Sequence, residues 1–145
     1  MKKTMNILTL IMFLWAGLAS AAEYAVIIHN KNDFSGNLKN FYLLKQGFRE
    51  WPSGVDVSPF ILKPEGDLKK TLVKVGFLKQ ILGMSVQDFN NHWTSQKSKG
   101  NSDKAVPLEN FEKILRYVKR EEGAIGFVPK NLAKGVNVVG TFEVD

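Results

Sequence analysis

The stretch FREWPSGVDVSPFILKP, residues 48–64, carries the clearest local signals in this chain of 145 residues. Its WPSG segment, residues 51–54, predicts a tight turn, because Pro presets one backbone angle and Gly permits a positive φ. The apolar side chains that follow predict a strand over residues 55–63, with a kink at Pro59. Residues 48–64 therefore predict a turn that leads into a buried strand, and the neighbouring segments are interpreted relative to it.

On either side of this stretch, segments with helical and with strand periodicity alternate. Residues 24–29 (YAVIIH) are a continuous apolar run that predicts a strand covered on both faces. Residues 30–36 predict a polar loop, and residues 37–46 a short helix closed by Gly47. A second helix is predicted over residues 68–82. Its expected inward stripe consists of Leu68, Leu72, Val75, Leu78 and Leu82.

The C-terminal half continues the alternation. Ser85 predicts the cap of another helix, and residues 95–105 predict a solvated loop. A further helix is predicted from Leu108 through Val118, and two strands over residues 124–128 and 136–144. The order of elements predicts one α/β domain with a mixed sheet flanked by helices. Ligands of such sheets lie beyond the carboxyl ends of strands, which points to the loops at residues 30–36 and 63–67. We expect these two polar loops to form one open face.

The first residues predict a secretory signal peptide over residues 1–22. Lys2 and Lys3 precede an apolar run at residues 7–18, and Ala19-Ser20-Ala21 supplies the small residues that a signal peptidase accepts, with Ala22 allowing a cut one position later. The run is shorter than the ~20 residues that a membrane-spanning helix needs. We therefore expect a periplasmic or secreted protein, a single mature domain over residues 23–145, and no membrane insertion after cleavage.

Composition and the absence of known motifs exclude several kinds of metal and catalytic site. The chain has no Cys, which excludes disulfides and thiolate metal sites, and its two His residues lack metal-ligand spacing. No motif for phosphate-loop, dinucleotide, zinc-hydrolase or serine-hydrolase chemistry occurs. The net charge of +6 comes from lysines interspersed with acids, and Trp51 and Trp93 are expected in the core. The expectation is therefore a protein that is not an enzyme, needs no cofactor and no metal, and does not bind nucleic acid.

A set of residues in a fixed order resembles a known family. Asn30, Gly47, Trp51, Gly54, Phe77 and Trp93 are followed by Gly123-Ala124-Ile125-Gly126-Phe127-Val128. This order is similar to that of the phosphate-binding proteins of ABC transporters and of short exported relatives with one lobe only. The resemblance covers nearly all of residues 23–145. It implies a single lobe of the type 2 periplasmic-binding-protein-like fold.

The resemblance also implies a ligand site, from which this chain departs. Family members hold phosphate at a helix N-terminus with an Arg and a Ser-Gly-Thr tripeptide. Here Lys63 stands at the Arg position, Glu65 at the acid, and Gly66-Asp67-Leu68 at the tripeptide. Lys63 is a point charge without a bidentate fork. Asp67 has two open roles, ligand contact and helix N-cap, and the cap is favoured because a carboxylate there occupies the N–H groups that an anion needs.

Two functions from different classes follow. In the first, the protein is an exported module related to solute-binding proteins. It binds phosphate or a similar oxyanion in uptake or sensing, with Lys63, Glu65, Gly66, Asp67 and Leu68 at the ligand. In the second, it is an interaction lobe that has kept the fold and lost the ligand, and it pairs with itself or with a membrane or periplasmic protein. One lobe has no hinge to close around a ligand, so tight capture by a monomer is not expected.

Overall fold

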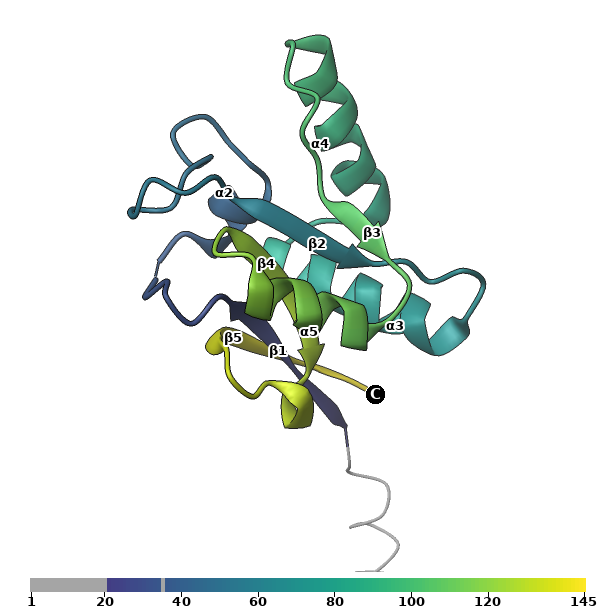
Figure 1. Ribbon diagram of the computed structural model, residues 1–145. Coiled ribbons are helices and arrows are strands. Elements are labelled where there is room, and N and C mark those ends of the chain that lie inside the picture. The colour runs from purple at the N-terminus through teal and green to yellow at the C-terminus, as the bar shows by residue number, and fades with distance from the viewer. Residues whose placement is uncertain (1–20, 35) are drawn as a thin grey trace, which may run out of the picture.

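A mixed sheet of five strands forms the centre of the computed structural model, which describes residues 21–34 and 36–145. The strand order is β3-β2-β4-β1-β5 (Figure 1). β2 runs parallel to β3 and β4, whereas β1 runs antiparallel to β4 and β5. The strands are β1 (Ala22–Ile28), β2 (Ser58–Leu62), β3 (Val106–Leu108), β4 (Ala124–Pro129) and β5 (Asn137–Val144). The predicted signal peptide, apart from its last two residues, lies outside the described residues.

Helices cover both faces of this sheet, which confirms the α/β fold class. They are α2 (Leu38–Tyr42), α3 (Leu68–Phe77) with the π-helical turn η1 (Leu78–Leu82), α4 (Val86–Ser98), α5 (Phe111–Arg120) and the 3-10 turn η2 (Lys130–Leu132). α5 lies over one face of the sheet, α3 lies on the other, and α4 projects away from both (Figure 1). The side chains of Asp67, Ser85 and Asn110 cap α3, α4 and α5 by accepting a backbone N–H three residues on.

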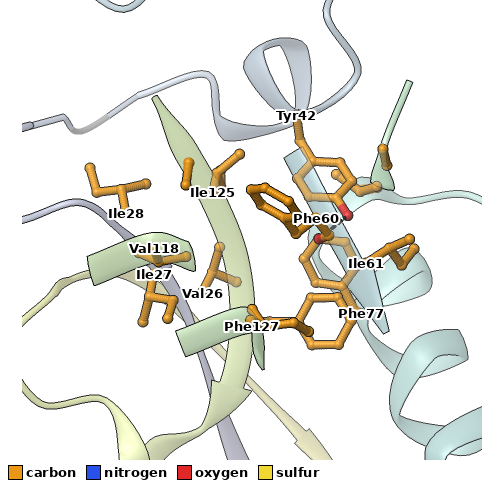
Figure 2. Packing of buried hydrophobic residues seen from close by; sticks show 14 of the residues in the cluster. Val26, Ile27, Ile28, Tyr42, Phe60, Ile61, Phe77, Val118, Ile125 and Phe127 are labelled. Atoms are coloured by element: carbon orange, nitrogen blue, oxygen red, sulfur yellow. Dashed lines mark hydrogen bonds between the residues drawn. The ribbon is translucent and has the colours of Figure 1, made fainter. Parts of the chain in front are cut away.

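The core centres on β4, the strand predicted over residues 124–128. Ile125 and Phe127 are fully buried, and the Phe127 ring stacks on Phe77 of α3 at 4.2 Å between centroids (Figure 2). On the opposite face, a Cβ added to Gly126 would come within 2.6 Å of Ile114 Cγ2 on α5. A Cβ on Gly123 would collide with the backbone oxygen of Asp56. Both glycines are therefore required for close packing.

Trp51 and Trp93, both predicted in the core, differ in how deeply they are buried. Trp51 is buried, and its indole N–H donates to the carbonyl oxygen of Gly123 at 2.9 Å. Trp93 is half-buried and packs edge-on against Phe89 of α4. Both therefore pack against the core, as predicted.

The inward stripe predicted for residues 68–82 is wrong in its N-terminal half. Leu68, Leu72 and Val75 are exposed at 73%, 45% and 40%, whereas Val73 and Phe77 are buried. Leu78 and Leu82 are buried as predicted, but they belong to the π-helical turn. The apolar residues of a straight α-helix four or seven apart share one face, and the change of helical period at residue 78 breaks that relation. The two halves of the apparent stripe therefore face different directions.

Other boundaries moved for local reasons. The polar segment expected as a loop from residue 95 begins with helix, since α4 runs to Ser98. Leu108, expected in a helix, ends the short edge strand β3, which the sequence pattern did not indicate. Val-Pro-Leu is too short for periodicity to reveal a strand. Pairing with Phe60, Ile61 and Leu62 of β2 defines it instead.

The two loops expected to form one face lie at opposite ends of the sheet. β1 and β2 run in opposite directions, because β1 is antiparallel and β2 parallel to β4. The loop after β1 is therefore next to the start of β4, and the loop after β2 lies at the far end (Figure 1). None of the helices in the described part of the chain combines the length and the hydrophobicity of a membrane-spanning segment.

Candidate functional site

The parallel strands β3, β2 and β4 end at one side of the sheet, which we call the carboxyl edge. α3 begins after β2, and α5 begins after β3. Two helix N-termini thus follow neighbouring strands, and the positive ends of two helix dipoles face this edge. This is where α/β sheets place ligands, and the predicted site at residues 63–68 lies here.

The predicted site forms a compact turn between β2 and α3. The N–H of Asp67 donates to the carbonyl oxygen of Pro64 at 2.9 Å, and both central residues, Glu65 and Gly66, have positive φ angles of 50° and 82°. Positive φ at both positions is typical of a type I′ turn, which suits Gly66 and strains Glu65. The N–H of Lys63 donates to Leu108 of β3 at 2.7 Å. The backbone of the turn is therefore held at both ends.

The side chains of this turn pair with one another. Lys63 Nζ lies 3.4 Å from Glu65 Oε1, and both side chains are about half-exposed. Asp67 Oδ1 accepts the N–H of Lys70 at 3.0 Å, which confirms Asp67 as the N-cap of α3. The hydroxyl of Thr71 donates to the Asp67 carbonyl at 2.9 Å. The five predicted site residues are thus contiguous and solvent-exposed, and their contact with a ligand stays a prediction.

A second cluster at the carboxyl edge was missed by sequence reasoning. Lys113 Nζ donates to Glu109 Oε2 at 3.0 Å, and Lys70 Nζ donates to the Glu109 carbonyl at 2.8 Å. The hydrogen bond and charge of Lys113, with smaller effects from the charges of Lys63 and Lys70, hold the pKa of the Glu109 carboxyl below its ordinary value. Asn110, the N-cap of α5, was the available signal, but the helix had been expected to begin earlier.

The loop after β1 makes its own contacts at the opposite edge. Lys31 pairs with Glu122 at 3.0 Å, and the side chain of Asn32 bonds the Glu122 carbonyl. Phe34 packs on Phe41 and Trp51, at 4.7 and 5.5 Å between ring centroids. Phe34 thus faces the core, and this loop contributes nothing to the carboxyl edge.

Both histidines make hydrogen bonds to the backbone. His92 Nε2 lies 2.6 Å from the carbonyl oxygen of Leu43, so this nitrogen carries the proton. His29 Nδ1 accepts the N–H of Lys31 at 3.1 Å. Among residues 21–34 and 36–145, no group of three His, Cys, Asp or Glu side chains is placed to hold a metal ion.

Comparison with known proteins relates the chain to others by fold. No family model matches it, and no curated protein matches it at a significant level. A similar fold occurs in the crystal structure of an ABC-type phosphate transport receptor from Vibrio cholerae, with a TM-score of 0.58 and 11% sequence identity. The match covers 86% of this chain and 55% of the receptor. The chain therefore has the fold of about half of a phosphate transport receptor.

Proposed function

We propose that the protein is an exported, non-enzymatic binding module that holds phosphate or a similar oxyanion at the carboxyl edge, in connection with uptake or sensing. The fold relation to a phosphate transport receptor supports a periplasmic location and this ligand class. The proposal assigns residues 1–22 to a cleaved signal peptide and residues 23–145 to one domain. Site contacts are assigned to Lys63 and to the start of α3, from Glu65 to Leu68.

The observation that carries this proposal is the position of the Glu109 carboxylate among three lysines. This carboxyl is exposed and yet has a lowered pKa, first because of Lys113 and then through Lys63 and Lys70. Three cations on three segments thus favour a negative charge at one point between the starts of α3 and α5. The same three cations attract an oxyanion at this point, and backbone N–H groups at a helix start add hydrogen bonds.

The carboxylates of the protein set the expected affinity. Asp67 already bonds the N–H of Lys70, and Glu65 pairs with Lys63, so an incoming anion must displace or tolerate them. Repulsion from these carboxylates opposes a dianion. The open, exposed turn also lacks a second wall. We therefore expect weak binding, on the order of 1 mM, unless another chain covers the edge.

Titration calorimetry with phosphate and with sulfate tests the proposal. We expect saturable binding that Lys63→Ala abolishes. Lys31→Ala is a matched control, because Lys31 is also an exposed lysine paired with a glutamate, but at the opposite edge. The Lys31→Ala variant should bind phosphate and sulfate with the affinity of the parent. Absence of any saturable heat, or equal loss in both variants, would contradict an oxyanion site at the carboxyl edge.

The interaction-lobe function remains a second candidate, favoured by the exposed face of α3. Leu68, Leu72 and Val75 lie on this face at helical spacing, and no acidic residue occurs in α3. Lysines flank the apolar stripe. The matching partner is a protein surface with an apolar centre and acidic surroundings.

Sedimentation of the purified protein at micromolar concentration bears on this second function. A dimer that Leu72→Gln dissolves without unfolding would favour it for pairing between copies of the chain. A monomer that binds phosphate at the carboxyl edge would favour the oxyanion module.

A further inference from the structure

A pocket of about 330 Å³ lies where α4, α3 and the segment leading into β3 meet. Its apolar wall includes Ile61 of β2 together with Phe89 and Trp93 of α4. Two lysines complete the lining, Lys74 of α3 and Lys104 of the segment before β3. The pocket is large enough for a small organic molecule, and it shares no lining residue with the turn at residues 63–68.

The charge of this pocket has one sign. Its lining includes two lysines and no carboxylate. Within residues 21–34 and 36–145, neither Lys74 nor Lys104 is engaged in an ion pair. Lys74 is half-buried, and burial lowers the pKa of its ammonium group. A partly desolvated cation without a counter-charge is unfavourable, and a bound anion would remove that penalty.

The indole of Trp93 supplies a third donor in the same wall. Its Nε1 atom is buried and has no acceptor among the described residues. Trp51 provides the contrast, since its indole N–H bonds the Gly123 carbonyl at 2.9 Å. A buried N–H without an acceptor is rare in folded proteins and calls for a partner. Among the described residues, one indole N–H without an acceptor and two lysines without an ion pair thus border one pocket.

We propose that this pocket binds a small organic carboxylate with a flat apolar body, such as an aromatic acid. The carboxylate accepts from Lys74, Lys104 and the indole N–H of Trp93, and the apolar body packs on Ile61 and Phe89. A fully hydrated inorganic anion would leave the apolar wall unused, and a neutral aromatic compound would leave both cations unpaired. The site is separate from the carboxyl edge, so it stands or falls independently of phosphate binding.

NMR of the purified 15N-labelled protein with benzoate tests this assignment directly. Indole N–H signals are resolved from the amides, and Trp93→Phe identifies the signal of Trp93. We expect benzoate to shift that signal saturably, with a Kd of about 1 mM or tighter. Benzamide is a control ligand with the same ring but no charge, and inorganic phosphate is a control anion without an apolar body. Neither should shift the Trp93 signal at the same concentrations.

A pair of lysine variants locates the binding site. Lys74→Met should weaken benzoate binding about tenfold, the usual scale for loss of one charge-assisted hydrogen bond. Lys79→Met removes a lysine that follows α3 but does not line the pocket, and it should bind as the parent does. An unchanged amide spectrum outside the pocket shows that each variant is folded. No saturable shift, an equal response to benzamide or phosphate, or parental affinity in Lys74→Met would each overturn the proposal.

Discussion

Three carboxylates at the carboxyl edge occupy positions that favour anions. Asp67 accepts an N–H of the first turn of α3, Glu65 pairs with Lys63, and Glu109 lies among lysines. Each is covalently attached and therefore present at a high effective concentration. The same features that attract an oxyanion are used within the chain to hold the turn and the two helix starts. Binding at this edge is thus a competition between internal and external anions.

Replacement of Asp67 tests the capping part of this competition. Asp67→Ala should lower the free energy of unfolding by ~1 kcal/mol, because the N–H of Lys70 loses its acceptor. Asp67→Ser keeps an acceptor and should cost less. Urea unfolding measures both. Because Ser removes the negative charge, phosphate should bind Asp67→Ser more tightly than the parent. An unchanged phosphate affinity would mean that Asp67 does not face the ligand.

Glu109 predicts a pH dependence with a definite sign. Its folded pKa lies below the ordinary value of 4.5, so its ionised form favours the folded state. This contribution is present above about pH 4.5 and is lost as the pH falls through the lower, folded pKa. Urea midpoints of the parent and Glu109→Gln should therefore differ at pH 6 and converge at lower pH. A difference that stays constant across this range would exclude the lysine field as its cause.

At the scale of elements, α3 shows what periodicity predicts and what it misses. Its start at Leu68 and its cap at Asp67 follow from residues that act locally, and both agree with the sequence prediction, whereas residues 78–82 of the predicted helix form the π-helical turn η1. The buried face of α3 does not agree with that prediction, because burial depends on which side meets the sheet. Leu68 and Leu72 have the spacing of a buried stripe but are exposed, whereas Val73 and Phe77 are buried. The short strand β3 was missed because its pairing partner β2 defines it.

Two substitutions on α3 test the corrected face. Phe77→Ala should destabilise the fold by about 3–5 kcal/mol, because the ring is fully buried and stacks on Phe127. Leu72→Ala should change stability by no more than about 0.5 kcal/mol, because its side chain is 45% exposed. Chemical denaturation of both variants gives the comparison. A larger loss of unfolding free energy for Leu72→Ala would mean that Leu72 is buried, as the sequence pattern predicts.

The central strand offers a second comparison at this scale. Ile125→Ala should cost about 2–5 kcal/mol, since the side chain is fully buried between the helix layers. Gly126→Ala should cost about 1–3 kcal/mol, because the added methyl group overlaps Cγ2 of the buried Ile114. Gly123→Ala should cost more than Gly126→Ala, because it meets backbone. Thermal unfolding of the three variants checks this ranking.

At the scale of the whole molecule, strand direction decides which loops belong to one site. The order of motifs predicted the α/β fold, and the match to a phosphate transport receptor agrees at the level of the fold. Strand direction was not predictable from periodicity, since each strand has the same pattern in either sense. The antiparallel β1 moves residues 30–36 to the far edge and leaves Lys63, Lys70, Glu109 and Lys113 as neighbours. The predicted turn at residues 63–68 is therefore one part of a larger cluster of lysines and carboxylates at this edge.

The central claim, oxyanion binding at the carboxyl edge, is tested most directly by mapping phosphate on the backbone. In 1H–15N spectra of the purified protein, phosphate should shift the amides of residues 66–70 and 109–113 saturably, with residues 30–34 unaffected. Lys63→Ala should remove these shifts. Saturable shifts at residues 30–34 in place of the carboxyl edge, or no saturable shift anywhere, would contradict the account.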